Sequence, residues 1–242
     1  MRLFNDFFSE DIYAFISQRD CDFQFKSSNE AVFNDEQKNY LKNEFRMIMG
    51  GQKCLLPPIV NIKQVHADAV FWVDKKYQED LIAGNADALL TNQKSLAIVI
   101  RIADCLPIYV YDRVNKCIGL IHAGWRSSQK SIVIKTIRCM SKNAHSQVKD
   151  MQFAFGPSIR SCCYEVGEEF KEIFPKELEL RNGKYFLDIA SINRNQLLSE
   201  GILENQISDV GICTHCDKRF FSYRREGKEA GRMLALMFRR SE

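Results

Sequence analysis

Three apolar segments between residues 96 and 123 constrain the fold of this chain more than any other feature. They have the sequences LAIVIRI (96–102), PIYVYD (107–112) and CIGLIHA (117–123). Short runs rich in β-branched and aromatic residues are typical of strands. The first and third runs are apolar at several consecutive positions, apart from Arg101, so we expect both faces of these strands to be covered.

The rest of the chain combines strands and helices. Further strands are predicted at AVFWV (69–73), MQFAF (151–155), DVGIC (209–213) and RFFSYRR (219–225). Five helices are predicted. The first spans 34–51 and stops at Gly50–Gly51, and the second spans 128–143. The third runs through Val166, Phe170 and Phe174, the fourth from an N-cap at Asp188 through Leu197, and the fifth spans 228–240. Because strands and helices do not alternate regularly, the pattern favours an α+β fold or a layered α/β sandwich over a doubly wound parallel sheet.

The composition limits the class of protein. The 242 residues, 45% of them hydrophobic and 27% charged, are expected to form a single domain over 1–242. The net charge of +3 comes from scattered residues, which predicts no binding to nucleic acid or membrane. No apolar run approaches the roughly 20 residues of a membrane span. The acidic N-terminal stretch lacks the core of a signal peptide, and nine cysteines are most simply kept reduced, so we expect a cytoplasmic protein.

Three residues at predicted strand ends could form one site. His66 precedes a strand, Cys105 lies between two strands, and His122 ends a third. Two imidazoles and one thiolate make a three-ligand zinc set whose fourth position is open to water or substrate. Two other interpretations stay open at this level. The histidines could be satisfied core residues beside a small buried cysteine, or Cys105 and His122 could form a nucleophilic pair without a metal.

A second group of thiols gives a weaker signal. Cys213 and Cys216 form a C-x-x-C motif, but a structural zinc ion would need two more ligands, which Cys162 and Cys163 could supply only if the fold brought them near. Reduced cysteines beside the site are the simpler interpretation.

The chain resembles the laccase-domain family, also called multicopper polyphenol oxidase and more recently purine nucleoside phosphorylase. The resemblance runs from about residue 62 to 233 in seven ordered segments: KQVHADAV, GNADALLT, IADCLPIYVYD, IGLIHAGWR, GPSIRSCCYEVG, LDIASINRNQL and CTHCDKRFFSYRREGKEAGRM. This chain has Ile102 where the family has Thr and Ser127 where it often has Gly. It has no counterpart of the family's glycine-rich N-terminal motif.

The resemblance implies a layered α/β/β/α sandwich with mixed sheets and a Zn²⁺ site made by His66, Cys105 and His122. It also implies phosphorolysis of adenosine, inosine, guanosine and methylthioadenosine, together with adenosine deamination. We expect Asp104, Cys105 and His122 to take part in catalysis, although Asp104 could instead only orient its loop. The side chains expected to contact nucleoside or phosphate are Gln64, Arg126, Asn193 and Arg225.

Two other activities are considered beside this one. A relative described as a peptidoglycan editing factor raises the alternative of a hydrolase or amidase that uses Cys105 and His122 on cell-wall precursors. Polyphenol oxidation is disfavoured, because a multicopper centre needs many imidazoles, commonly in His-x-His pairs. This chain has four histidines and no such pair, so any copper at the zinc site would be adventitious.

Overall fold

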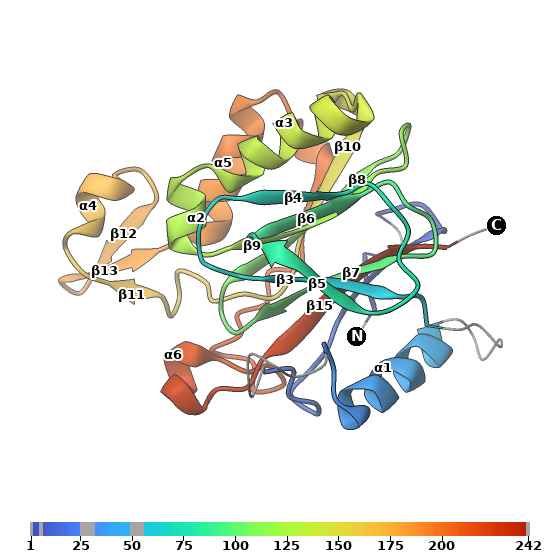
Figure 1. Cartoon of the computed structure of the whole chain (residues 1–242). Coiled ribbons are helices and arrows are strands. Elements are labelled where there is room, and N and C mark those ends of the chain that lie inside the picture. Colours follow the sequence, from blue (N-terminus) through green and yellow to red (C-terminus); the bar gives the residue numbers. More distant parts are fainter. Residues whose placement is uncertain (1, 5–6, 25–31, 49–55, 241–242) are drawn as a thin grey trace.

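The fold is a four-layered α/β/β/α sandwich. A computed structural model describes residues 2–4, 7–24, 32–48 and 56–240 of the chain. Two six-stranded mixed sheets pack face to face, and helices cover both outer faces (Figure 1). A small antiparallel sheet with one short helix projects from one end of the sandwich (Figure 1). The layered sandwich predicted from the sequence is therefore confirmed.

Each of the two large sheets mixes parallel and antiparallel neighbours. In spatial order the first sheet contains β1 (Arg2–Leu3), β2 (Ile12–Ile16), β15 (Met233–Arg239), β7 (Ala97–Ile102), β3 (Ile59–Lys63) and β5 (Leu81–Asn85). The second sheet contains β14 (Ile207–Asp209), β10 (Met151–Phe155), β8 (Leu106–Asp112), β9 (Ile118–Ala123), β6 (Ala88–Thr91) and β4 (Val70–Val73). The small sheet contains β11 (Glu165–Val166), β13 (Lys184–Leu187) and β12 (Leu178–Arg181).

The helices are short and lie outside the sheets. They are α1 (Asp35–Ile48), α2 (Trp125–Gln129), α3 (Ile132–Ala144), α4 (Phe170–Ile173), α5 (Ile189–Ser199) and α6 (Tyr223–Glu226), with 3-10 turns at Val148–Asp150, Glu204–Gln206 and Gly227–Glu229. Helices α3 and α5 cover the second sheet, and α1 covers the first (Figure 1). Among the described residues, none of these helices combines the length and apolar character that a membrane crossing needs.

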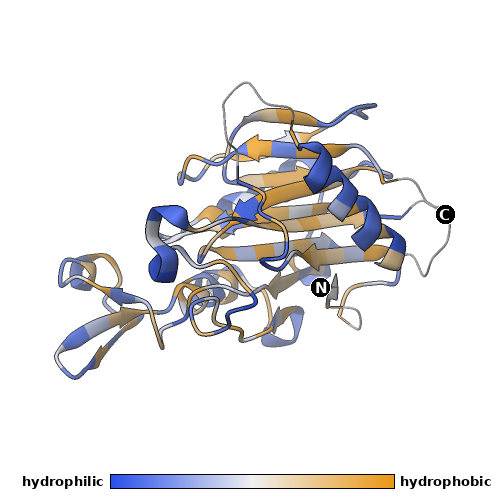
Figure 2. Cartoon of the chain, turned by 90° about the horizontal axis from the view of Figure 1, so that it is seen from below, coloured by the Kyte–Doolittle hydropathy of each residue, from blue (hydrophilic) through white to orange (hydrophobic). Residues whose placement is uncertain are grey.

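Three layers of apolar side chains fill the spaces between the four layers of the sandwich. Strand β7 shows how: Ile98 and Ile100 face the second sheet, whereas Ala97 and Val99 pack in the cluster that includes Leu41 of α1. The strands beneath α1 are accordingly apolar, while the helix itself carries many hydrophilic residues (Figure 2). Coverage of both faces explains why the run 96–102 lacks the alternation of a half-exposed strand.

Most of the predicted elements are present. The five strands predicted at 69–73, 96–102, 107–112, 117–123 and 151–155 correspond to β4, β7, β8, β9 and β10. Helix α1 lies within the predicted 34–51, although Gly50–Gly51 fall outside the described residues. Helix α5 begins after Asp188, whose side chain accepts a hydrogen bond from the N–H of Ser191, so the predicted N-cap is confirmed.

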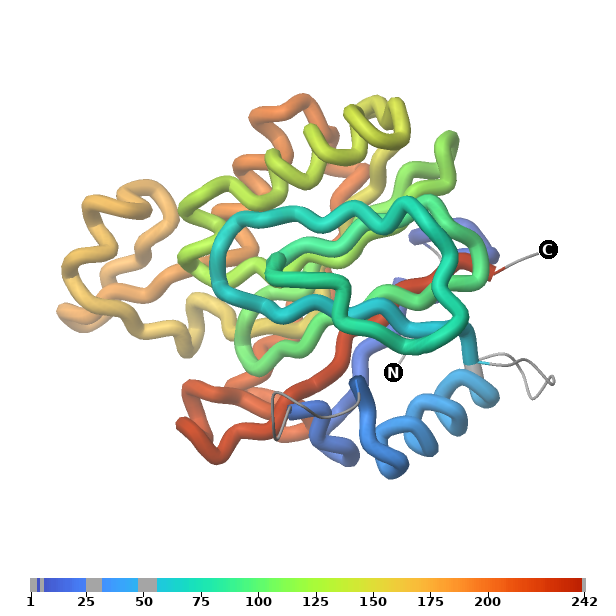
Figure 3. Tube along the Cα trace, viewed as in Figure 1, coloured from blue at the N-terminus to red at the C-terminus, as the bar shows by residue number. Residues whose placement is uncertain are grey.

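The predicted closing helix over 228–240 is wrong. Residues Met233–Arg239 form β15, a strand buried along its whole length between β2 and β7. Met, Leu and Ala favour helices in isolation, but here the pairing and burial within the sheet override that preference. The C-terminal strand thus lies beside the N-terminal β2, far away in the sequence (Figure 3).

Four other predictions need correction. The helix expected through Val166, Phe170 and Phe174 is reduced to the four residues of α4, because Val166 belongs to β11. The helix over 128–143 is divided into α2 and α3 by Ser131, whose φ of 57° is left-handed. The strand expected at 209–213 has only its first residue in β14. The segment 219–225 forms no strand but leads into α6.

Candidate metal centre and active site

Two histidines and one cysteine come together where the chain passes between the two sheets. His66 lies in the loop that follows β3 of the first sheet, and Cys105 lies in the connection from β7 to β8 of the second. His122 lies in β9, next to β8. The ligand atoms of these side chains are all within 4.8 Å of one another. The two imidazole rings meet edge to face, with their centroids 4.8 Å apart.

Asp87 holds two of these three residues in place. Its carboxylate is fully buried between β5 and β6 and accepts hydrogen bonds from the backbone N–H groups of His66 (3.0 Å) and Ala67 (2.7 Å). The same carboxylate lies 2.8 Å from Nδ1 of His122. Burial alone would raise the pKa of Asp87, but the bonds from His122 and Ala67 keep it below its usual value. Asp87 therefore stays ionised and fixes the ring of His122 and the backbone of His66.

The contact with Asp87 sets the tautomer of His122. A carboxylate accepts a hydrogen bond, so Nδ1 of His122 carries the proton that points to Asp87. The other ring nitrogen, Nε2, is then left to act as a ligand or base toward Cys105. A carboxylate behind a histidine is the arrangement that orients metal-binding imidazoles in proteins. The sequence analysis quoted Asp87 within GNADALLT but gave it no role.

Cys105 and His122 form a coupled acid–base pair. Burial alone would raise the pKa of the thiol and lower that of the imidazolium, but the charges of the two groups reverse both trends. The positive charge of His122 brings the pKa of Cys105 down to about 6. The thiolate of Cys105, with the carboxylate of Asp87, raises the pKa of His122 to about 9. At neutral pH the metal-free pair is a thiolate beside an imidazolium.

The surroundings of Cys105 leave room for an ion. A Cβ placed on Gly124 would lie 3.1 Å from Sγ of Cys105 and 3.9 Å from the ring of His66. Any side chain at position 124 would therefore crowd the space that the three ligands share. A small residue here, together with two nitrogen donors and one thiolate, fits a transition metal such as zinc.

Asp104 fixes the loop that carries Cys105. Its backbone has a left-handed φ of 86°, which is uncommon for residues other than glycine. Its carboxylate accepts hydrogen bonds from the Thr214 hydroxyl (2.6 Å), the Ser222 hydroxyl (3.1 Å) and the Arg224 backbone N–H (2.7 Å). Both carboxylate oxygens are engaged in these bonds. The side chain is therefore placed to orient the loop, which the sequence analysis left open as the alternative to a catalytic role for Asp104.

A large cationic cavity opens beside the three ligands. Its volume is about 710 Å³. The cationic residues that line it are Lys63, Arg101, Arg126, Arg224 and Arg232. Among the described residues that line the cavity, Asp104 is the single acidic one. Three aromatic side chains complete the wall: Trp125, Tyr164 and Tyr223. A cavity with this charge favours anionic ligands, and its aromatic faces can pack against a planar ring.

The four residues expected to contact substrate lie in different places. Gln64 and Arg126 line the cavity. Gln64 also exchanges two hydrogen bonds of 2.7 Å with the backbone of Arg101, so it ties β3 to β7 next to His66. Arg126 stacks on Trp125, with 4.2 Å between the guanidinium carbon and the ring centroid.

Asn193 and Arg225 lie outside the cavity lining. Asn193 is fully buried and donates to the Ser128 hydroxyl and to the Ile189 carbonyl, which joins α5 to α2. Arg225 donates to the carbonyls of Thr214, His215 and Phe220 and pairs with Glu226. Its guanidinium organises the loop 214–220, and the neighbouring Arg224 lines the cavity instead.

Arg101 is the charged residue that interrupts the apolar sequence of β7. Its guanidinium is buried and donates to the carbonyls of Phe23 (2.6 Å) and Val32 (2.9 Å). It also lies over the ring of Phe33. Since Arg101 lines the cavity as well, it joins the N-terminal segment to the wall of the site.

The fold and the ligand set define a class of layered α/β proteins with a candidate His₂Cys metal site open to a cationic cavity. The chain belongs to the family described as multi-copper polyphenol oxidoreductase laccase, whose model matches residues 15–240.

Known relatives agree with this assignment. The chain is 38% identical over 203 residues to a purine nucleoside phosphorylase of Borreliella burgdorferi, which covers 80% of this chain and 83% of that protein. It is 31% identical over 202 residues to adenosine deaminase RL5 from an unknown prokaryotic organism, with 76% of each chain covered. The crystal structure of YlmD from Geobacillus stearothermophilus has the same fold, with a TM-score of 0.80, 25% identity, and coverage of 96% of this chain and 93% of that one.

We predict that Asp87→Asn weakens metal binding at this site. The amide cannot accept from both the loop and His122 as the carboxylate does, so the affinity for Zn²⁺ should fall about 10- to 100-fold. Zinc competition titrations measure this, with His66→Ala as the baseline for loss of the site. Asp112→Asn is a matched control, because Asp112 is an equally buried carboxylate that caps a turn at the opposite end of β8. Equal losses in both variants would contradict a specific role for Asp87.

We also predict that metal binding strengthens with pH. Between the pKa values of about 6 for Cys105 and about 9 for His122, a divalent ion must displace the His122 proton. The affinity for Zn²⁺ should therefore fall about tenfold for each unit that the pH drops from 9 to 6. Below that range Cys105 is protonated as well, and the fall becomes steeper. An affinity that stays constant with pH, once the binding seen in His66→Ala is subtracted, would contradict the thiolate–imidazolium pair.

Proposed function

We propose that this protein is a zinc-dependent enzyme that cleaves purine nucleosides with phosphate. The observation that carries the proposal is the position of His66, Cys105 and His122 beside a cavity rich in cationic and aromatic side chains. The names of the relatives, purine nucleoside phosphorylase in particular, supply the substrate class. The free cysteines of the described chain fit a reducing cytoplasm.

Zinc suits the donor set better than copper redox chemistry does. Two imidazoles and one thiolate with an open position are typical of catalytic zinc. The four histidines of the whole chain are too few for a multicopper centre, and none form a His-x-His pair. When bound, zinc supplies Lewis acidity at its open coordination position.

The arginines of the cavity would bind phosphate. The stacking of Arg126 on Trp125 occupies a face of the guanidinium, so the N–H groups at its edge stay directed away from the ring. Guanidinium groups bind phosphate through paired, charge-assisted hydrogen bonds. In phosphorolysis a phosphate oxygen forms a bond to C1′ of the ribose, the bond from C1′ to the purine nitrogen breaks, and the purine leaves with a proton.

The remaining groups of the site would hold the nucleoside and the metal. Tyr164 and Trp125 offer aromatic faces to the base. Burial raises the pKa of Tyr164 to about 12, so its hydroxyl stays protonated and can donate to the substrate. His122 would hold the metal through Nε2, while Asp87 keeps the proton on Nδ1 in place.

Adenosine deamination is a second candidate activity. It is favoured by the similarity to a protein named adenosine deaminase. In this reaction water adds to C6 of the base and ammonia leaves with the transferred proton. Both reactions would use the same cavity, so the products of a single incubation distinguish them.

We predict that the purified protein converts adenosine and phosphate to adenine and ribose 1-phosphate, or adenosine and water to inosine and ammonia. His66→Ala should lower kcat/KM by at least about 100-fold, because it removes a metal ligand. His145→Ala is the matched control and should keep full activity, since His145 is exposed at the end of α3. Chromatography of the products measures both outcomes.

Two results would contradict the proposal. The first is absence of turnover in protein that contains a full complement of zinc. The second is full activity in His66→Ala or after chelation. Activity that survives metal removal but is lost on alkylation of Cys105 would instead indicate a cysteine hydrolase, which incubation with a muropeptide precursor tests.

We predict that Arg126→Ala acts mainly on phosphate. Loss of charge-assisted hydrogen bonds to phosphate should raise the KM for phosphate about 10- to 100-fold, with a much smaller change in the KM for the nucleoside. Arg138→Ala, on the exposed side of α3, is a suitable control. An equal rise in both KM values would show that Arg126 supports the cavity wall as a whole rather than binding phosphate.

A further inference from the structure

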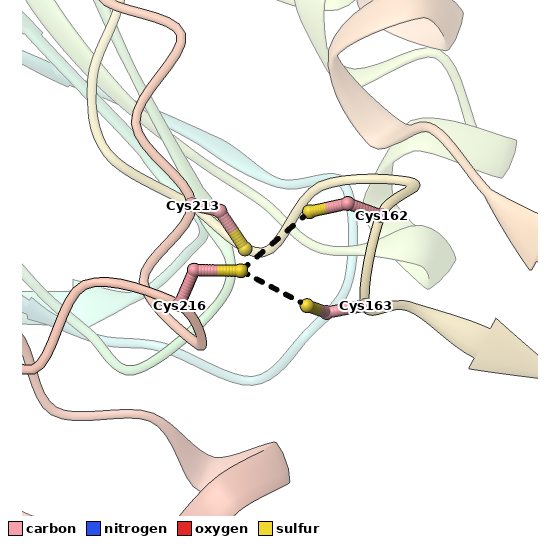
Figure 4. Close-up of side chains that lie close together, drawn as sticks. All are labelled: Cys162, Cys163, Cys213 and Cys216. Atoms are coloured by element: carbon pink, nitrogen blue, oxygen red, sulfur yellow. Dashed lines mark hydrogen bonds between the residues drawn. The ribbon is translucent and has the colours of Figure 1, made fainter.

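Four cysteines converge at a second place, outside the candidate active site. Cys162 and Cys163 lie in the loop between β10 and β11, and Cys213 and Cys216 lie in the loop that follows β14. Their sulfurs point toward one another from the two loops (Figure 4). The four sulfur atoms all lie within 4.8 Å of one another, with 3.2 Å between Cys163 and Cys216 and 3.9 Å between Cys162 and Cys216.

These distances match a tetrahedral metal site. Zn–S bonds of about 2.3 Å in a tetrahedron place the sulfurs about 3.8 Å apart. The sulfur separations observed lie on both sides of that value, so a small adjustment of the side chains would equalise them. Four thiolates in a closed tetrahedron are the ligand set of structural zinc. We propose that Cys162, Cys163, Cys213 and Cys216 bind a second zinc ion, which has a structural role.

Backbone hydrogen bonds fix the cysteines within both loops. The N–H of Asp217 donates to the carbonyl of Cys213 (2.9 Å), and the N–H of Cys163 donates to the carbonyl of Arg160 (2.9 Å). The four sulfurs are therefore held in place by the turns that carry them. Cys213 is buried, whereas Cys162 and Cys216 are exposed, so an ion can enter from the solvent side.

The two loops are also joined directly. The N–H of Ser158 donates to the carbonyl of Ile212 (3.2 Å), and the N–H of Thr214 donates to the carbonyl of Ser158 (3.0 Å). This pairing sets the distance between the adjacent cysteines of one loop and the C-x-x-C of the other. The sequence alone gave no measure of that distance, which is why Cys162 and Cys163 could not be assigned as partners of Cys213 and Cys216.

A zinc ion here would brace one wall of the active-site cavity. Thr214 follows Cys213 and donates to Asp104, and the N–H of Ile159 donates to the carbonyl of Asp104. Tyr164 follows Cys163 and lines the cavity. Both loops thus hold the residue that precedes Cys105. Binding displaces the protons of the thiols into solvent and links the two loops through four bonds.

The zinc content of protein purified under reducing conditions tests this proposal. The wild type should contain about two zinc ions per chain, one in each site. His66→Ala should keep about one, held by the four cysteines, and the double variant Cys213→Ser/Cys216→Ser should also keep about one, at the active site. Cys139→Ser, which changes a partly buried cysteine of α3, is the matched control and should match the wild type.

The zinc content of His66→Ala tests the proposal even if the double cysteine variant fails to fold. A zinc content near zero in folded His66→Ala would overturn the proposal, as would iron in place of zinc. A mass lower by two hydrogens for each cysteine pair would show disulfides instead and would overturn it as well. Because the readout is metal content rather than nucleoside turnover, it stays independent of the proposed activity.

Discussion

The buried carboxylate of Asp87 is the interaction on which the candidate site depends. It accepts hydrogen bonds from the loop after β3 and lies 2.8 Å from Nδ1 of His122 in β9, so one side chain connects the two sheets of the sandwich. A buried charge without partners would be costly. Here its partners are backbone N–H groups of the loop that carries His66 and the ring of His122, so the requirement to satisfy the carboxylate fixes where His66 and His122 lie.

The four-layered fold explains why the site lies at one end of the sheets. The chain leaves the first sheet at Ile102 and enters the second at Leu106, and Cys105 occupies that crossing. Asp104 holds the crossing in a left-handed conformation through hydrogen bonds to Thr214 and Ser222 of the connection between β14 and α6. The ends of the strands thus place His66, Cys105 and His122 close together, while residues of strands and short helices, such as Arg101 and Arg126, form the cationic wall of the cavity.

Sequence reasoning predicted a layered fold because strands and helices do not alternate regularly along the chain, and the family resemblance implied the four layers. It predicted that His66, Cys105 and His122 bind a metal because their types and their positions at strand ends fit such a site, and the structure places them close together. It missed Asp87, whose role depends on a contact between segments 35 residues apart. It placed a helix at Met233–Arg239, where local preference favours a helix but burial between β2 and β7 requires a strand. It expected Arg225 in the cavity, but the distinction between Arg224 and Arg225 depends on which way a short helix turns their side chains.

Anomalous diffraction at the zinc edge from crystals of the zinc-loaded protein tests the central claim most directly. The account predicts an anomalous peak within bonding distance, about 2.0–2.3 Å, of a nitrogen of His66, Sγ of Cys105 and Nε2 of His122, with Nδ1 of His122 still bonded to Asp87. A zinc-loaded crystal with no peak between these three residues, or with His122 turned so that Nδ1 binds the metal, would contradict it.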